Sequence, residues 1–281
     1  GFTFTTNLIF QTPGKVWARV LEVSPANLRG YINITGDHLK NKKYDQTIAD
    51  CNKAISLHLG SSKIYNNRGM AYKHTQKFDK ALLDFKKAIE LDSKYADVYN
   101  NFGTVYYSQK RYNKAIFNYN KAIALDPTNA AYYNNRGVVY KLGKKYVEAI
   151  SDYTQAILLN PLFDDAFHNR GLLYFNNKKE YEKAIADYTS AIRINPLSAS
   201  AYYDRGIVFS NTKEYKKAIS DYTKAVKLKP DFVQAYHNRA ITLYYLKNYD
   251  KSFSDVQKVL RLGGKVNPAL LQLLNKQIGA Q

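Results

Sequence analysis

Six amide or acidic side chains recur at an almost constant spacing, and their chemistry is hydrogen bonding. This set, called the amide row below, consists of Asn67, Asn101, Asn135, Asn169, Asp204 and Asn238. Because an amide both donates and accepts hydrogen bonds, such a row can pair with the backbone of an extended peptide independently of its side chains. The same amides can instead bond to a neighbouring helix of their own chain. The sequence leaves both interpretations open.

Basic residues recur with the same period. This set, called the basic ridge below, consists of Lys43, Lys77, Lys110, Arg111, Lys144, Lys145, Lys178, Lys179, Lys213 and Lys247, with Lys42 beside its first member. The whole chain carries a net charge of +19. A basic ridge can steer a protein toward an acidic protein, a nucleic-acid backbone or an anionic membrane. Solvated lysines that only keep the chain in solution are the alternative.

Catalytic and metal-binding signatures are missing from the sequence. It contains no P-loop, no Gly-rich dinucleotide turn, no HExxH and no nucleophile elbow. Cys51 is the single cysteine, which excludes an intrachain disulfide framework and a multi-cysteine zinc site. His168 and His237 have no other metal ligands close to them in sequence. We therefore expect no enzymatic activity, no cofactor and no metal.

The elements that position these residues are tandem repeats. Gly69, Gly103, Gly137, Gly171 and Gly206 lie 34, 34, 34 and 35 residues apart, and Ala240 follows after 34 more. Behind each of these positions, aromatic and small residues recur at three- and four-residue steps, which predicts a second helix. Pro127, Pro161, Pro196 and Pro230 end four of the repeats. Most tyrosines, including Tyr153, Tyr188 and Tyr222, are expected in the core between the helices.

This pattern resembles the tetratricopeptide repeat (TPR) family over about residues 28 to 266. Six units begin at residues 62, 96, 130, 164, 199 and 233. The resemblance implies an all-α fold, a right-handed α-solenoid of stacked helix-turn-helix units. The fourth unit is one residue longer than the third between its glycine and the first alanine of its second block. We expect that extra residue near residues 177–180, in the turn between the two helices.

Four segments follow from this register. Residues 1–27 form a non-repeat arm, which begins with a β-prone stretch and in which Pro13-Gly14 predicts a turn. Residues 28–61 form a degenerate first TPR unit, in which Thr35 stands at the glycine position. Residues 62–266 form the six TPR units. Residues 267–281 form a capping helix and tail, since Pro268 is favourable in a first helical turn.

The TPR resemblance also implies where a ligand binds, because the first helix of each unit lines a concave groove in that family. The amide row falls at position 6 of the units, one of the groove positions. Other predicted groove residues are Asn66, Asn100, Asn134, His168, Tyr203 and His237 at position 5, and Tyr107, Phe175, Tyr244 and Tyr245 further along. Of the carboxylate clamp found in chaperone-binding TPR proteins, only the position-6 asparagine is present. Binding of a chaperone's acidic C-terminus through that clamp is therefore not expected.

Arginine and aspartate recur together and predict ion pairs. The arginines are Arg68, Arg136, Arg170, Arg205 and Arg239, and the aspartates are Asp84, Asp152, Asp187, Asp221 and Asp255. The one unit with Phe102 in place of the arginine has Asn118 in place of the aspartate. Because both change within one unit, we expect each pair inside its own unit, as in Arg136 with Asp152 and Arg205 with Asp221. A partly exposed pair contributes only about 0–1 kcal/mol and mainly sets the register of the helices.

Three functions are compatible with this sequence. The first is a non-enzymatic scaffold that binds an extended or helical segment of a protein partner in the TPR groove. The second is a structural subunit that assembles end to end or through its N-terminal arm. The third is a basic accessory subunit of a nucleic-acid-containing complex.

The single cysteine fits a reducing compartment, and the high pI and a first residue other than Met suit an imported organellar protein, so an intracellular location is expected. No apolar run approaches the roughly 20 residues that span a bilayer.

Overall fold

The computed structural model describes residues 13–278, and of these the side chains of Lys178 and Ile278 lie outside the description. All regular elements in this range are helical. They are α1 (Pro13–Val23), α2 (Leu28–Lys40), α3 (Tyr44–Ser56), α4 (Ser62–His74), α5 (Phe78–Leu91), α6 (Ala96–Ser108), α7 (Tyr112–Leu125), α8 (Ala130–Leu142), α9 (Tyr146–Leu159), α10 (Asp164–Leu173), the π-helical turn η1 (Tyr174–Lys178), α11 (Tyr181–Ile194), α12 (Ala199–Asn211), α13 (Tyr215–Leu228), α14 (Val233–Tyr245), α15 (Tyr249–Arg261) and α16 (Pro268–Ile278). The predicted all-α class is confirmed, and the six expected units contain the twelve helices from α4 to α15.

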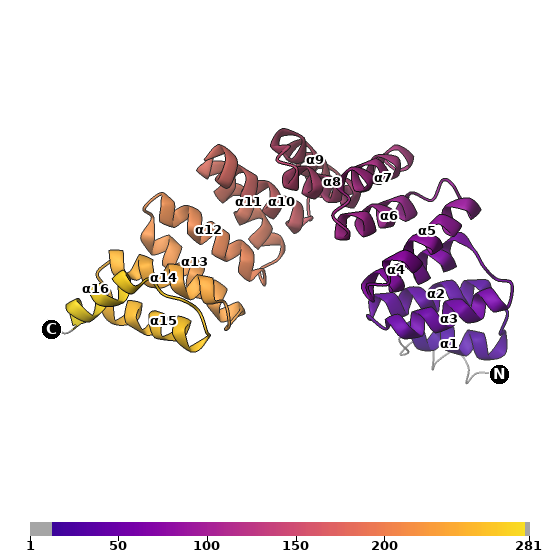
Figure 1. The fold of residues 1–281 in the computed structure, drawn as a ribbon, viewed down its shortest axis with the longest axis horizontal. Helices are drawn as coiled ribbons and strands as arrows, with labels where there is room; N and C mark the ends of the chain where they lie inside the picture. Colours follow the sequence, from indigo (N-terminus) through magenta and orange to yellow (C-terminus); the bar gives the residue numbers. More distant parts are fainter. Residues whose placement is uncertain (1–12, 279–281) are drawn as a thin grey trace, which may run out of the picture. The chain divides into compact units, whose positions relative to one another are not determined.

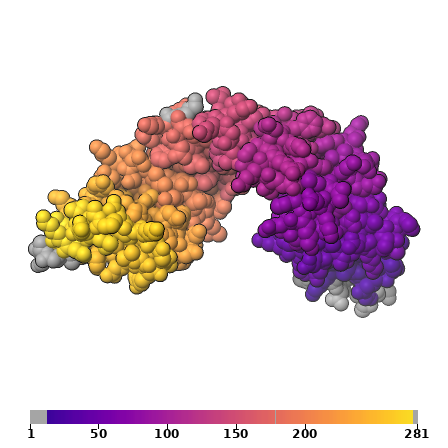
Figure 2. All heavy atoms as spheres, in the orientation of Figure 1, coloured from indigo at the N-terminus to yellow at the C-terminus, as the bar shows by residue number. Residues whose placement is uncertain are grey.

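The chain divides into two compact units, residues 1–139 and 140–281. Within the first unit α4 packs on α5 and α6 on α7, and within the second α10 packs on α11, α12 on α13 and α14 on α15 (Figure 1). We call the first helix of each pair the A helix (α2, α4, α6, α8, α10, α12, α14) and the second the B helix (α3, α5, α7, α9, α11, α13, α15). Successive pairs also pack on one another within each unit, as α5 does on α6 and α13 on α14, and Figure 2 shows their atoms as neighbouring regions of the colour sequence.

Each pair is held together by a small residue on the A helix that faces a large residue on the B helix. Gly206 faces Tyr222, and a Cβ added to Gly206 would lie 2.7 Å from the tyrosine ring. Gly69 with Phe85 and Gly103 with Tyr119 repeat this arrangement. These rings are almost completely buried, so the missing side chain is what lets the two helices approach.

The pairs at the two ends obey the same size rule with other residues. Ala240 occupies the glycine position of α14, and its B-helix neighbour is the smaller Val256. Thr35 occupies this position in α2, and its neighbour is Cys51, which is fully buried. A larger A-helix residue is therefore accompanied by a smaller B-helix residue.

Six of the seven turns between A and B helices share one hydrogen-bond pattern, and a lysine occupies the left-handed position in most turns. In six of seven turns the residue in the left-handed conformation is a lysine, with φ between 52° and 63°; the seven residues are Lys42, Gln76, Lys110, Lys144, Lys179, Lys213 and Lys247. Glu214 N–H donates to Phe209 C=O at 2.8 Å and Lys213 N–H to Ser210 C=O at 3.1 Å, the hydrogen bonds of a Schellman motif. Glycine is the residue that adopts this conformation at least cost.

Replacing Lys213 by glycine should therefore raise the free energy of unfolding by roughly 0.5–1 kcal/mol, because a left-handed non-glycine residue carries a steric cost. Lys224→Gly, within α13, is the matched control and should lower stability by about 1 kcal/mol through helix propensity. Urea denaturation followed by circular dichroism measures both. Equal losses of stability in the two variants would show that the turn tolerates lysine without strain.

The extra residue of the fourth unit is accommodated by the π-helical turn η1. The α-helical part of α10 ends at Leu173, and η1 continues to Lys178 before the left-handed Lys179. Glu180 N–H donates to Tyr174 C=O, six residues back, where the other turns bridge five. The insertion predicted near residues 177–180 is thus confirmed in place, and its form is a wider helical turn.

The ends of the array correct one expectation. Pro13-Gly14 begins α1 and not a turn, because proline fits the first helical position. Leu21 of α1 packs against the core formed by Tyr31 and Cys51. The degenerate first unit is a complete helix pair, and α16 covers the last one through Leu274, which is fully buried beside Ala240 and Val256. The β-prone start of the arm lies outside the described residues.

Candidate functional site

In the first unit, hydrogen bonds of the amide row join neighbouring A helices. Asn101 donates from Nδ2 to Oδ1 of Asn66 at 2.8 Å, and Asn135 donates in the same way to Asn100 at 2.9 Å. Position 6 of one A helix is therefore bonded to position 5 of the A helix before it. Asn66, Asn101 and Asn134 are buried.

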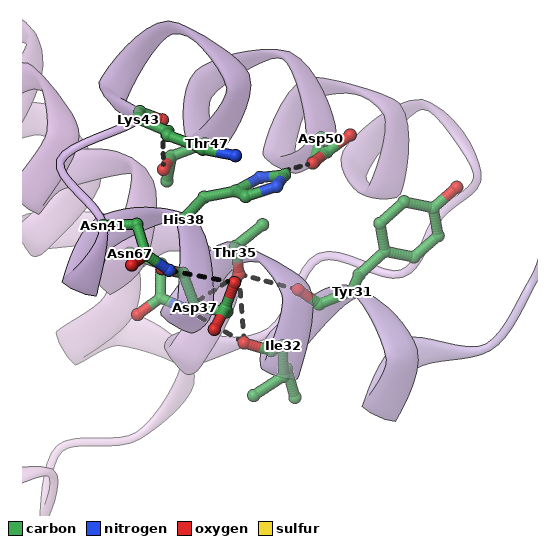
Figure 3. Close-up of polar contacts among 10 residues, drawn as sticks. All are labelled: Tyr31, Ile32, Thr35, Asp37, His38, Asn41, Lys43, Thr47, Asp50 and Asn67. Carbon is green, nitrogen blue, oxygen red and sulfur yellow. Dashed lines mark hydrogen bonds and ion pairs between the residues drawn. The ribbon is translucent and has the colours of Figure 1, made fainter. Parts of the chain in front are cut away.

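The first member of the row follows the same rule with a different acceptor. Asn67 donates from Nδ2 to the Thr35 hydroxyl at 2.9 Å and to the Ile32 carbonyl at 3.4 Å, both on α2 (Figure 3). The Thr35 hydroxyl in turn donates to the Tyr31 carbonyl at 2.7 Å. These bonds tie α4 to α2.

In the second unit, position 5 carries other side chains, and the link to position 6 of the next A helix is kept. Asn238 donates from Nδ2 to the Tyr203 hydroxyl at 3.1 Å. His168 Nε2 lies 2.7 Å from Asp204 Oδ2, so a histidine is matched by the one acid of the row. His168 is thus matched by Asp204, whereas Tyr203 is followed by the usual asparagine, Asn238, at position 6 of the next A helix.

For Asn101 and Asn135 the hydrogen bonds favour the interpretation in which the amides bond to a neighbouring helix of their own chain. Each amide group donates to the preceding A helix, because an unpaired buried N–H would cost roughly 1–3 kcal/mol. Variation at position 5 follows from this pairing as well. Peptide binding by the amide row stays a prediction. A peptide would have to use the hydrogen-bonding capacity that the bonds between A helices leave unused.

The predicted ion pair inside one unit is confirmed for Arg205 and Asp221. The guanidinium donates two parallel hydrogen bonds to the carboxylate, both at 2.8 Å. Arg68 with Asp84, Arg170 with Asp187, and Arg239 with Asp255 repeat this geometry. Asp84 raises the pKa of Arg68. For Arg136 and Asp152 the pairing stays a prediction.

These pairs are more deeply buried than the sequence indicated. Asp221 is only 5% exposed, so the pair is largely removed from water. The same arginine also donates to Thr189 of the preceding B helix at 3.0 Å. Each such arginine therefore links two B helices as well as the two helices of its own unit.

Comparison with known proteins identifies the repeat. Models described as "Tetratricopeptide repeat" match residues 62–95, 130–163 and 199–232, and residues 85–117. A model described as "TPR repeat" matches residues 103–143 and 176–213. The chain belongs to the tetratricopeptide repeat family.

Solved TPR structures share this fold. The Cut9 and Hcn1 hetero-tetramer of the APC/C matches with a TM-score of 0.71 and 17% identity over 94% of the chain, which spans about half the matched chain (52%). PilF of Pseudomonas aeruginosa matches with a TM-score of 0.66 and 22% identity, covering 78% of this chain and 96% of its own. YrrB, described as a TPR protein with an unusual peptide-binding site, has a TM-score of 0.57 and 24% identity, covering 68% and 97%. Among curated proteins, none matches the sequence significantly.

The aromatic residues predicted further along the TPR groove are mostly held in packing. Tyr107 packs beside Tyr119, Phe175 beside Tyr188, and Tyr244 beside Val256. Tyr245 is the exposed member, with 61% of its surface accessible, and it stacks on Tyr215 at 5.6 Å between ring centroids. His237, which has no further repeat after it, keeps Nδ1 buried without a hydrogen-bond partner in the described part of the chain.

Two lysines that sequence analysis did not single out lie in the same register as these aromatic residues. Lys73 and Lys141 occupy position 12 of their TPR units, the position of Tyr107 in the unit between them. Burial lowers the pKa of both lysines. The shared register was the signal that could have identified them.

The residues of the basic ridge that the structure describes are all exposed, and the side chain of Lys178 lies outside the described residues. Many of them are the left-handed residues of the A–B turns, and the others follow directly after these residues. A positive charge at the C-terminal end of a helix also interacts favourably with the helix dipole. The turn geometry thus explains where these lysines lie, and it leaves their charge available to a partner.

The Cys51 thiol and the possible metal ligands are the remaining groups of chemical interest. Burial raises the pKa of the Cys51 thiol to about 12, so it stays protonated near neutral pH. No group of three or more His, Cys, Asp and Glu side chains could hold a metal within the described part of the chain. None of the described helices is long and apolar enough to cross a membrane.

Proposed function

We propose that this TPR protein is a non-enzymatic scaffold whose A-helix face binds an extended or helical segment of a protein partner, and that this segment carries carboxylates. Support at the level of the family comes from the repeats themselves and from YrrB, a TPR protein with a peptide-binding site. The particular observation that carries the proposal is the state of Lys73.

Lys73 is half-buried, and burial alone lowers the pKa of its ammonium. Within residues 13–278, no carboxylate lies within ion-pair distance of it. A charge that loses water without a partner costs free energy. A carboxylate supplied by a bound segment would offset this cost, so Lys73 is prepared for an anionic ligand.

The surroundings of Lys73 add to this positive potential. Lys73 and Lys42 both lower the pKa of His74, after the larger effect of burial. His74 stacks on Tyr44 with 4.8 Å between the ring centroids. In the second unit Lys141 is also half-buried, and its ammonium donates to Asn169 Oδ1 at 3.3 Å. Each unit therefore presents a partly desolvated lysine on an A helix.

The test of this function begins with random 12-residue peptides displayed on phage and selected on the full chain. We expect the selected peptides to be rich in Asp and Glu, and Lys73→Met to weaken their binding about tenfold. Lys87→Met is the matched control, because Lys87 is exposed on a B helix and paired with Glu90 at 3.1 Å. Selected peptides without carboxylates, or equal affinity for wild type and Lys73→Met, would reject the proposal.

Lys73→Met should also stabilise the free protein, by roughly 0.5–1 kcal/mol, because it removes a partly desolvated charge that is kept for binding. The folded pKa of Lys73 lies below its unfolded value, so its charge is unfavourable to folding at neutral pH. The difference between variant and wild type should shrink as the pH rises through the lowered pKa toward the unfolded value of about 10.4. Urea denaturation at pH 7 and pH 10 measures this difference, and a variant less stable than wild type at pH 7 would contradict the account.

A further inference from the structure

The B helices are joined by an arginine bridge that recurs in both units. Arg205 binds Asp221 in its own unit and Thr189 on the preceding B helix. Equivalent bridges run from Arg68 to Asp84 and Asn52, from Arg170 to Asp187 and Thr154, and from Arg239 to Asp255 and Thr223. The second full repeat departs from this rule.

In that repeat all three bridge positions change together. Phe102 stands in place of the arginine, Asn118 in place of the aspartate and Lys86 in place of the Asn or Thr. Asn118 bonds to its own helix, from Nδ2 to the Lys114 carbonyl at 2.8 Å. The bridge between α5 and α7 is therefore missing, and an aromatic ring occupies its place.

A pocket of about 450 Å³ lies at this position, lined by Phe102, Tyr106, Asn113, Lys114, Phe117 and Asn118. The Phe102 ring is supported by Tyr106 at 5.5 Å between centroids. Phe117, which also lines the pocket, is 57% exposed. We call this the Phe102 pocket.

The last repeat shows what the same place looks like with the bridge intact. A cavity there has Arg239 and Asp255 in its wall, and Ser254 stands where the first unit has Phe117. Its lining combines this ion pair with apolar residues such as Leu243. The Phe102 pocket differs from it by Phe102 and Asn118 in place of the ion pair and by Phe117 in place of Ser254.

The rim of the Phe102 pocket is positively charged. Lys114 and Lys121 lie three residues before and four residues after Phe117, so all three share one face of α7. The Lys114 ammonium lies 5.6 Å from the Tyr106 ring centroid, and the Lys121 ammonium 4.9 Å from that of Phe117. The sequence of α7 contains no carboxylate that could neutralise them.

We propose that the Phe102 pocket is a second docking site, on the B-helix side of the first unit, for an aromatic or large aliphatic side chain of a protein partner. The two lysines favour an acidic partner segment, because carboxylates on either side of the inserted side chain would pair with Lys114 and Lys121. The pocket is formed by α6 and α7, and neither Lys73 nor Tyr107 of the proposed A-helix face is among its lining residues.

The probe is a fluorescein-labelled 12-residue peptide with a central Phe between Asp and Glu residues and Gly and Ser elsewhere. Its binding to the full chain is followed by fluorescence anisotropy up to millimolar concentration of protein. The triple variant K86T/F102R/N118D rebuilds the arrangement of Thr223, Arg239 and Asp255. It should weaken binding at least tenfold while unfolding at the same or a higher temperature, so the loss cannot be ascribed to misfolding.

Two single variants complete the test. Phe117→Ser, which installs the residue of the last repeat, should weaken binding at least fivefold. Leu83→Ser is its matched control, since Leu83 is 67% exposed one repeat earlier, above the intact Arg68 bridge, and binding should not change. Lys73→Met should not change the part of the binding that depends on the central Phe of the probe, which separates this site from the A-helix face.

Three outcomes would overturn the proposal. In the first, wild type and the triple variant bind the probe equally. In the second, the wild-type chain shows no binding that depends on the central Phe of the probe. The third is self-association of wild type, seen by light scattering and abolished by Phe117→Ser, which would make a second copy of this chain the occupant.

Discussion

Asp221→Asn is expected to lower the free energy of unfolding by about 3–5 kcal/mol, the range measured when one partner of a buried ion pair is removed. The carboxylate accepts two hydrogen bonds from Arg205 and is 5% exposed, so the amide would leave the guanidinium partly desolvated without a counter-charge. Asp231→Asn, at an exposed aspartate, should stay within about 0.5 kcal/mol of wild type. Chemical denaturation of the full chain measures both. A loss below about 1 kcal/mol for Asp221→Asn would show that these pairs contribute no more to stability than surface salt bridges do.

The repeat with Phe102 and Asn118 suggests the second half of this experiment. Arg205→Phe combined with Asp221→Asn copies that natural pair into the second unit. Because the uncompensated charge disappears, the double variant should recover about 1–3 kcal/mol relative to the sum of the two single variants. Additive effects would show that the arginine and the aspartate stabilise the fold independently.

Gly206→Ala should destabilise the protein by roughly 1–3 kcal/mol, although alanine is the better helix former. The added Cβ would lie 2.7 Å from the Tyr222 ring, so the ring or the helix must move. Tyr222→Val should restore part of the loss, because the last repeat already combines Ala240 with Val256. The measurement is again chemical denaturation of the single and double variants.

The informative control for this pair is Tyr222→Val alone. It removes most of a fully buried ring and leaves a cavity beside Gly206, so it should cost about 2–5 kcal/mol. If the double variant is less stable than both single variants, size complementarity between the two helices does not explain their close approach.

The fold was predictable from the sequence because its main determinants are local and repeated. The glycine spacing fixed which residues of the two helices face each other, and it located the extra residue that η1 accommodates. Arg205 and Asp221 were paired correctly because Phe102 and Asn118 change in the same unit. The degree of burial of that pair was missed, since it depends on the packing of neighbouring B helices.

The candidate site was less predictable, because the same residue types serve packing and binding. Asn101 has the right chemistry for a peptide backbone, and only the positions of adjacent A helices show that its amide donates to Asn66. Lys73 is one lysine among many in the sequence, and its distinction is the burial of its charge. The start of α1 at Pro13 was missed because Pro-Gly is typical of turns as well as compatible with a first helical turn.

The most direct test of the proposed scaffold function is to locate a bound peptide on the two faces of the repeats. A peptide selected on the full chain is resynthesised with a photoreactive amino acid and cross-linked, and the modified residues are identified by mass spectrometry. The account predicts cross-links on A helices, at or beside Lys73 and Tyr107 in the first unit or Lys141 in the second, and their loss in Lys73→Met for the first-unit site. Cross-links confined to B helices and unaffected by Lys73→Met would contradict binding at the A-helix face.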